Sequence, residues 1–243
     1  PPLLLRSAPD RRRRTLSSLS DLQRLPETAR EVRGIAGALG VEPGKFIFTG
    51  RRANEAQVKG MDLSLYRILA FATHALMPYE MHGLEEPALA LTAPEVAGAP
   101  GDGLLTVSEV RRLTLEADWV VLTGCNTGRG NGRVAEAISG LGRAFLHAGA
   151  RSLLFTHWEV DSTVARMLVT DVFKRQGADK RLSPGEAMRR AKMALIDGPG
   201  YPDHDGETLF AYAHPIFWAP FALFGDGKAA AGPSQKLGAA PKN

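Results

Sequence analysis

The chain has 243 residues, of which 44% are hydrophobic and 23% are charged, a composition typical of one globular domain. No apolar run approaches the roughly 18 residues that a membrane span requires, so the composition argues against a membrane protein. A net charge of +4 and four consecutive arginines at 11–14 suggest nucleic-acid binding, but the segment around them lacks aromatic residues that stack on bases. We therefore expect no nucleic-acid partner and no membrane contact.

Both ends of the chain have the composition of flexible segments. Residues 1–24 are rich in arginine, proline and serine, and the opening Pro1 to Leu5 is too short for the core of a signal peptide. Residues 228–243 offer almost nothing to bury, which predicts a disordered tail. The folded domain is expected over 25–227. A single cysteine excludes an internal disulfide and suits a reducing, cytoplasmic location.

Helical and strand patterns alternate between these ends, which predicts an α/β domain with a mostly parallel sheet covered by helices on both faces. In chain order, we expect a helix over 27–39, a strand over 45–49, a helix over 53–61 and a strand over 67–75. The long segment over 78–103 carries several prolines and glycines and a short strand at 88–91. Because long loops in compact domains are usually functional or disordered, this segment is our candidate for a lip on the substrate side.

Capping signals and apolar runs define the second half of the domain. Thr106 and Glu109 form a capping box that begins a short helix, and Asp118 opens a near-continuous apolar strand. A second capping box at Ser183 and Glu186 opens a helix that ends near 196. The other elements expected here are a helix over 133–147, a strand over 151–157, a helix capped by Asp161, and a last strand within 216–224 that closes the sheet.

Two side chains able to exchange protons stand where predicted strands end. Cys125, the only cysteine, follows the apolar strand and enters a glycine-rich turn, and His74 lies at the end of the strand over 67–75. They are 51 positions apart, close to the roughly 50-residue His-to-Cys separation of caspase-type proteases. Because open α/β sheets place their chemistry outside the carboxyl ends of the strands, we expect both groups at one rim.

Several other interpretations of these residues are weaker. A lone cysteine is often an unreactive residue that packs in the core. The local signature of papain-type enzymes around the cysteine is absent. The glycines at 124 and 128 lie at the wrong offsets for an α/β-hydrolase elbow. A glycine cluster at 128, 130 and 132 could cradle phosphate in a nucleotide binder, but Arg133 occupies the final glycine place of the dinucleotide motif. The six histidines lack the paired spacings of a zinc site, so no metal or other cofactor is predicted.

From about Leu25 to Gly227 the chain resembles the CHAT domains, which are caspase-like domains often carried behind TPR repeats. The resemblance rests on Phe71-Ala72-Thr73-His74, on Ala117-Asp118-Trp119-Val120-Val121-Leu122-Thr123-Gly124-Cys125-Asn126-Thr127-Gly128, on Gly142-Arg143-Ala144-Phe145-Leu146-His147-Ala148-Gly149-Ala150-Arg151, on Trp158-Glu159-Val160-Asp161 and on His214-Pro215-Ile216-Phe217-Trp218-Ala219-Pro220-Phe221. It implies a caspase-hemoglobinase fold and a cysteine endopeptidase dyad of His74 and Cys125. It also implies that the usual amino-terminal strand of the family is absent or degenerate here.

Further site residues surround this dyad. Such domains usually have glycine after the histidine, where its N–H helps to hold the oxyanion, and this chain has Ala75. Alanine keeps the N–H, so the N–H groups of Ala75 and Cys125 are expected to form the oxyanion hole if the backbone does not require positive φ. The candidates for lining the substrate groove are Gly124, Asn126, Trp158 and Asp161, although the last two also fit packing and capping roles.

Two functions of different classes fit these features. The first is a cysteine endopeptidase that cleaves a protein or peptide substrate and is regulated by an upstream or partner sensor of the TPR type. The second is a catalytically silent caspase-like module that binds another protein, for which Ala75 is the main argument. Four carboxylates in the long segment favour a basic or apolar residue before the cleaved bond, although solvated loop charges are the simpler explanation. They are Glu80, Glu85, Glu86 and Asp102.

Overall fold

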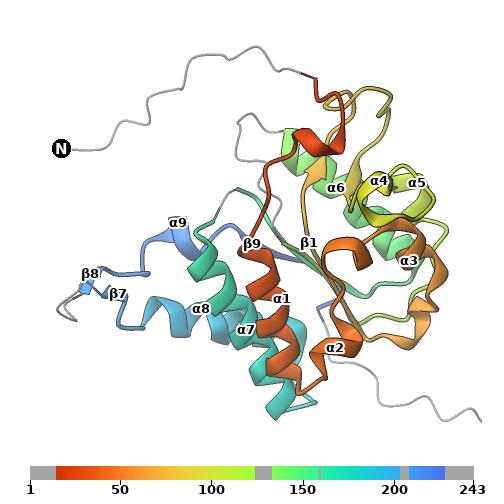
Figure 1. The fold of residues 1–243 in the computed structure, drawn as a ribbon. Helices are drawn as coiled ribbons and strands as arrows, with labels where there is room; N and C mark the ends of the chain where they lie inside the picture. Colours follow the sequence, from red (N-terminus) through yellow and green to blue (C-terminus); the bar gives the residue numbers. More distant parts are fainter. Residues whose placement is uncertain (1–14, 124–132, 159, 203–207, 228–243) are drawn as a thin grey trace, which may run out of the picture.

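Three parallel strands and one antiparallel strand form the central sheet of the computed structural model, which describes residues 15–123, 133–158, 160–202 and 208–227 (Figure 1). The strands lie in the order β1 (Ile68–Ala72), β5 (Trp119–Thr123), β6 (Ser152–Thr156) and β9 (Phe221–Gly225). β1 and β6 both run parallel to β5, whereas β9 pairs antiparallel with β6. The predicted α/β class with a mostly parallel sheet is confirmed.

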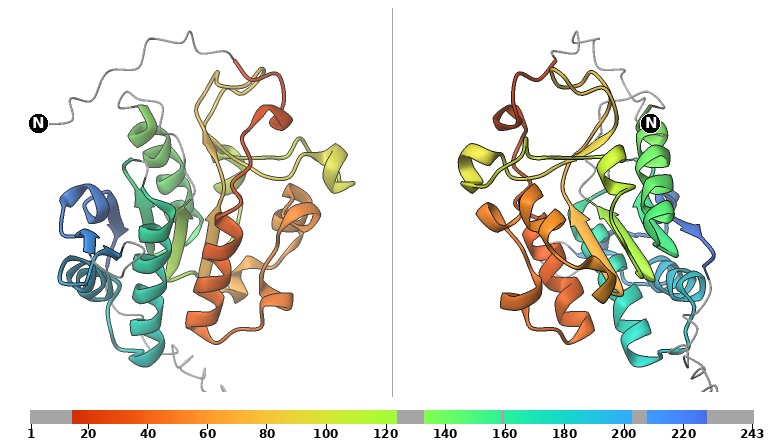
Figure 2. Two further views of the ribbon diagram at one scale, coloured as in Figure 1. Left: turned by 60° about the vertical axis from the view of Figure 1, so that its left-hand side comes forward. Right: turned by 90° about the vertical axis from the view of Figure 1, so that its right-hand side faces the viewer.

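Helices cover both faces of this sheet. On one face lie α1 (Thr28–Leu39), α7 (Ser162–Ala178) and α8 (Pro184–Ile196), and the other face is covered by α6 (Arg133–Ala148) and the short α5 (Val107–Val110). Figure 2 shows α1 and α7 side by side, with α6 across the sheet from them. No helix within the described ranges is long and apolar enough to cross a bilayer.

β5 is the centre of the hydrophobic core. Its five residues are all buried, and they alternate between two clusters: Trp119 and Val121 face α7, while Val120 and Leu122 face α6. Aromatic pairs extend both clusters, with ring centroids 5.5 Å apart for Trp119 and Phe173 and 5.4 Å apart for Phe71 and Phe145. Burial on both faces explains why the sequence of this strand is continuously apolar.

A second, antiparallel sheet continues directly from β1. It consists of β2 (Ala75–Leu76), β3 (Ala88–Ala90) and β4 (Leu104–Thr106), with β3 in the middle. The strand expected at 88–91 is therefore present as β3. The capping box at Thr106 and Glu109 is also present and begins α5 where β4 ends.

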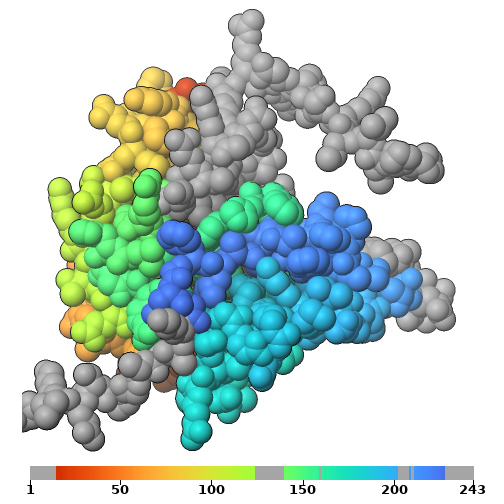
Figure 3. All heavy atoms as spheres, turned by 180° about the vertical axis from the view of Figure 1, so that it is seen from behind, coloured from red at the N-terminus to blue at the C-terminus, as the bar shows by residue number. Residues whose placement is uncertain are grey.

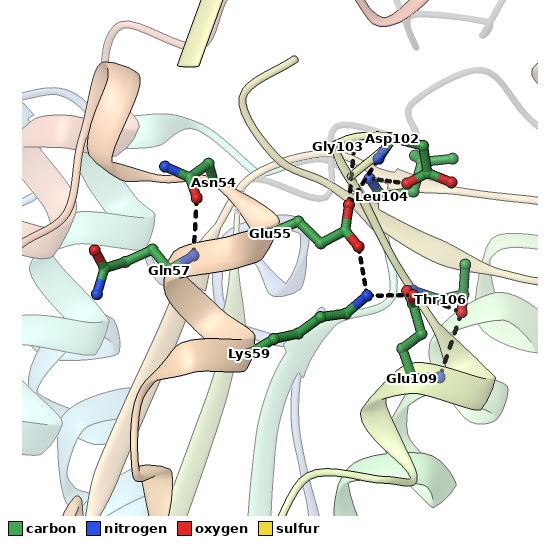
Figure 4. A network of polar contacts seen from close by, with 9 residues as sticks. All are labelled: Asn54, Glu55, Gln57, Lys59, Asp102, Gly103, Leu104, Thr106 and Glu109. Atoms are coloured by element: carbon green, nitrogen blue, oxygen red, sulfur yellow. Dashed lines mark hydrogen bonds and ion pairs between the residues drawn. The ribbon is translucent and has the colours of Figure 1, made fainter. Parts of the chain in front are cut away.

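A polar network fastens this second sheet to α3 (Glu55–Gly60), as Figure 4 shows. The carboxylate of Glu55 accepts hydrogen bonds from the N–H groups of Asp102, at 2.9 Å, and Gly103, at 3.0 Å. Lys59 bridges Glu55 and Glu109, which lies on α5. Burial raises the pKa of the Glu55 carboxyl, but hydrogen bonds from Lys59 and from the two N–H groups outweigh it and lower that pKa overall.

Shorter elements complete the described chain. They are 3₁₀ helices over Leu19–Asp21, Gly50–Arg52 and Leu63–Leu65, helices α2 (Pro43–Phe46), α4 (Pro94–Ala97) and α9 (Pro215–Trp218), and a ribbon of β7 (Tyr201–Pro202) and β8 (Thr208–Phe210). Seen from behind, α8 and the segment that follows it form one continuous area beside α6 (Figure 3).

Two sequence-based expectations about strands were wrong. The strand expected over 45–49 is absent: Pro43 begins the short helix α2, and no strand of the described chain pairs with the extended residues that follow. The closing stretch over 216–224 is divided into α9 and β9. His214 and Pro215 explain this division, because the ring Nδ1 of His214 accepts a hydrogen bond from the N–H of Ile216 and proline favours the first helical turn.

Replacing Leu153 by alanine tests the two-sided core. Leu153 is fully buried in β6, so Leu153→Ala is expected to lower the free energy of unfolding by about 3 kcal/mol through lost transfer energy and a residual cavity. The matched control is Leu65→Ala, because Leu65 is 74% exposed. Urea denaturation of both variants measures the difference, and equal losses would contradict the assignment of the core.

Replacing Glu55 by glutamine tests the polar network. The variant loses charge-assisted hydrogen bonds and is expected to be less stable by about 2 kcal/mol at neutral pH. Because the folded chain lowers the pKa of Glu55, its contribution is present above the ordinary value of 4.5 and is lost as the pH falls through the lowered value. The difference in free energy of unfolding between the wild type and Glu55→Gln should therefore be smaller in acid than at pH 7, as measured by denaturation at both pH values. Replacing the exposed Glu95 by glutamine should cause no difference at either pH.

Candidate active site

The register of the two central strands relates two positions at the carboxyl edge of the sheet. β1 pairs with β5 from Ile68 opposite Trp119 to Ala72 opposite Thr123, so that paired residues are 51 positions apart. The pairing continues past the strand end, where the N–H of Thr73 donates to the carbonyl oxygen of Thr123 at 3.0 Å. His74 follows directly. Cys125 is 51 positions after His74, and it lies outside the described residues, as do Gly124 and Asn126.

His74 is held at the junction of the two sheets. Its side chain is half-buried, and its ring Nε2 lies 2.6 Å from the carbonyl oxygen of Gln23. Its own carbonyl oxygen accepts a hydrogen bond from the N–H of Ala90 in β3. Because a carbonyl oxygen only accepts, Nε2 carries the proton of this hydrogen bond. The neutral ring therefore has Nδ1 as its basic nitrogen.

Ala75 fits its position without backbone strain. Within the described ranges, the only non-glycine residue with positive φ is Tyr79, so the alanine after the histidine does not adopt a conformation that favours glycine. Ala75 is 3% exposed and pairs with Leu89 in an antiparallel ladder. His74 and Ala90 are the neighbouring hydrogen-bonded pair, so by alternation the N–H of Ala75 points away from β3.

A buried carboxyl group stands beside the end of β5. Glu31, in the first turn of α1, is 7% exposed, and its Oε1 has no hydrogen-bond partner. Burial raises the pKa of Glu31, and the neighbouring hydroxyl of Thr123 offsets part of this rise, although no hydrogen bond of good geometry joins the two groups. Thr123 is two residues before Cys125. The structure therefore places a titratable group next to the strand that leads to the cysteine.

Neither Glu31 nor Gln23 stands out in the sequence as a candidate site residue. An acidic residue in the first turn of a helix normally faces solvent and complements the helix dipole, so the residue type alone indicated nothing unusual. One signal was available: Glu31 and Ile35 are four residues apart, so the glutamate lies on the apolar face of α1. The role of Gln23 had no signal, because it acts through its main-chain oxygen.

Trp158 and Asp161 lie beyond the end of β6. Trp158 is 45% exposed, and its ring N–H donates to the carbonyl oxygen of Ile216 at 3.3 Å. The carboxylate of Asp161 accepts hydrogen bonds from the N–H groups of Thr163 and Val164 and so caps α7. Both residues follow a strand that runs parallel to β5, which puts them at the same edge of the sheet as His74.

The carboxylates of the segment over 78–103 mostly bind main-chain N–H groups of the residues that flank this segment. Three of them accept main-chain hydrogen bonds: Glu80 from Met77, Glu86 from Ser108 and Asp102 from Leu104. Glu85 is exposed. Among the described residues, no group of three histidine, aspartate or glutamate side chains is arranged to hold a metal ion.

Comparison with known proteins finds one family model and two relatives that are similar to this chain. A family model described as the CHAT domain matches residues 1–226. Tetratricopeptide repeat protein 28 of Mus musculus is 31% identical over 140 residues, and its Homo sapiens counterpart is 29% identical over 139 residues. Each match covers 56% of this chain and only 5% of the relative, so the chain corresponds to a small part of these much longer proteins.

Replacing Glu31 by glutamine tests whether the carboxyl group is held in an unfavourable environment. Because burial raises its folded pKa, the wild-type chain loses stability as the pH rises from 4.5 through the raised value. Glu31→Gln removes this loss. Urea denaturation across that range should therefore show that the stability of the variant relative to the wild type increases as the pH rises. The control Glu27→Gln changes an exposed carboxylate next to the same helix. A stability difference for Glu31→Gln that does not vary with pH would contradict the assignment.

Proposed function

Because this chain belongs to the CHAT domain family, a caspase-like and peptidase-related family, we propose that it is a cysteine endopeptidase acting on a protein or peptide substrate. The catalytic residues proposed are His74 and Cys125. The observation that carries the proposal is the parallel register of β1 and β5, whose 51-residue spacing is also the spacing of these two residues. In a parallel sheet, groups at matching places past the strand ends share one rim.

In the proposed reaction, the thiolate of Cys125 attacks the peptide carbonyl carbon and forms an acyl-enzyme. His74 then donates a proton to the departing amine, and water hydrolyses the acyl-enzyme. The hydrogen bond from Nε2 of His74 to the carbonyl oxygen of Gln23 supports a specific assignment of this proton. Since Nε2 is engaged with the main chain, we assign the transferred proton to Nδ1 of the protonated ring.

The N–H groups of Ala75 and Cys125 are the proposed oxyanion donors. The buried position of Ala75, its ordinary backbone conformation and the direction of its N–H away from β3 support this role. Loss of one such donor typically costs about 2.7 to 4 kcal/mol of transition-state stabilisation. For the thiolate, we propose stabilisation by the amino-terminal end of α6, which begins at Arg133, and by Arg129.

The activity is proposed to depend on a sensor of the TPR type. The two curated relatives are named as tetratricopeptide repeat proteins and are about twenty times longer than the matched segment, which covers 5% of each. A reducing compartment such as the cytoplasm fits a lone thiol that must stay free. The alternative function is a silent protein-binding module, in which Cys125 would have an ordinary, unactivated thiol.

Alkylation of the single cysteine distinguishes these two functions, because every labelled molecule reports on Cys125. If His74 and Cys125 form an ion pair, iodoacetamide should label the wild type quickly at near-neutral pH, and His74→Asn should slow the rate about tenfold or more. The control His82→Asn removes an exposed histidine and should leave the rate unchanged.

Cleavage of a peptide library completes this test. Cys125→Ala should abolish cleavage while its circular dichroism stays that of the wild type, because the nucleophile is removed without disturbing the two clusters around β5. Labelling rates that are slow and equal in the wild type and His74→Asn, together with no cleavage, would favour the silent module. A Cys125→Ala protein that still cleaves would rule out the proposed nucleophile.

A further inference from the structure

The loop that joins β2 to β3 begins with a tight turn whose sequence does not suit its backbone. The N–H of Glu80 donates to the carbonyl oxygen of Met77 at 3.1 Å, which closes a β-turn. Pro78 holds the second position of this turn, and Tyr79, with a φ of 66°, holds the third. This is the pattern of a type II turn, in which the third position favours glycine. A large side chain there makes the folded backbone less stable.

The ring of Tyr79 makes no contact that would offset this cost. It is 76% exposed, and no aromatic pair or side-chain hydrogen bond joins it to another described residue. Among the large hydrophobic side chains of the described chain, only Leu65 is comparably exposed, at 74%, and Leu65 precedes β1 at the opposite edge of the sheet. An unfavourable backbone conformation that is retained without a packing benefit indicates a functional role.

The rest of the loop is held firmly on both sides of the turn. Leu76 and Leu84 are buried in the same hydrophobic cluster. The N–H of Tyr79 donates to the carbonyl oxygen of Leu84 at 2.7 Å, and the N–H of Leu16 donates to the carbonyl oxygen of Glu80 at 2.8 Å. The ring of Tyr79 therefore projects from a rigid support, and a rigid support reduces the entropy that is lost when a contact forms.

The loop also lies on a defined side of the proposed catalytic residues. β2 begins directly after His74, and Figure 2 shows the loop beyond the carboxyl end of β1. Tyr79 is five residues after His74, an extended distance of at most roughly 17 Å. In the proposed reaction His74 protonates the departing amine, so the part of the substrate that follows the cleaved bond passes His74. About five residues of an extended substrate cover the distance to Tyr79.

We propose that Tyr79 is a substrate-binding residue that contacts the polypeptide about three to five residues after the cleaved bond. This inference rests on the proposed endopeptidase function. The face of a tyrosine ring attracts cations, and the exposed Glu85, which follows the hydrogen-bonded Leu84, adds a carboxylate to the same loop. The contacted side chain is therefore a basic one. A contact this far from the reacting bond contributes to binding and lowers KM without changing kcat.

Two lengths of one peptide test this contact. The best-cleaved sequence of the peptide library is made with one residue after the bond and with five, of which the last three are arginines. Tyr79→Gly should raise KM about tenfold for the long peptide and leave the short one unchanged, because the short peptide does not reach the ring. Tyr79→Phe keeps the ring and should behave as the wild type. The matched control Leu65→Ala should change neither KM.

Two further measurements separate binding from a structural role. Because glycine suits the third position of the turn, Tyr79→Gly should raise Tm by about 2 °C. Iodoacetamide should label Cys125 of this variant at the wild-type rate. A lower Tm or slower labelling would show that Tyr79 supports the fold or the catalytic residues, and would overturn the proposed contact.

The kinetic outcomes distinguish this inference from the proposed function. If the wild type and Tyr79→Gly have the same KM for the long peptide, or if both peptides are affected equally, the proposed contact is wrong while the endopeptidase function stands. If the wild type cleaves neither peptide, the endopeptidase function and the contact that rests on it are both wrong.

Discussion

The parallel pairing of β1 with β5 is the constraint on which the rest of the arrangement depends. β5 gives alternate side chains to two hydrophobic clusters, so a slip of one residue would exchange Trp119 and Val121 with Val120 and Leu122. Neither cluster has room for the other set, since packed interiors contain few voids. Core packing therefore determines the register, and the register determines which residues past the strand ends lie opposite each other.

Polar contacts at the carboxyl edge of the sheet orient His74. The ring of His74 is held by the carbonyl oxygen of Gln23, and its main chain is held by β3, so segments from three parts of the chain meet at one residue. Behind the end of β5, the buried Glu31 has an unpartnered oxygen and a raised pKa. A carboxyl group in that setting costs stability at neutral pH, which is a common property of functional sites.

The two neighbouring central strands differ in burial although both are apolar. β5 has a strand on each side and helices on both faces, whereas β1 has a strand on one side and an apolar cavity of about 830 Å³ on the other. Folded proteins normally protect such an edge, because unpaired main-chain groups beside apolar side chains attract other strands. The half-buried β1 ends two residues before His74.

Local signals in the sequence were sufficient for the α/β class, the cap at Thr106, the end of α1 at Gly40 and the placement of His74 at a strand end, because each depends on neighbouring residues. The absence of a strand at 45–49 and the burial of Glu31 depended on partners far away in the chain, whereas the split of 216–224 follows a local cap, because His214 and Pro215 begin α9. A strand needs another strand to accept its hydrogen bonds, and the energetic state of a carboxylate depends on what surrounds it. Only the tertiary structure specifies those neighbours.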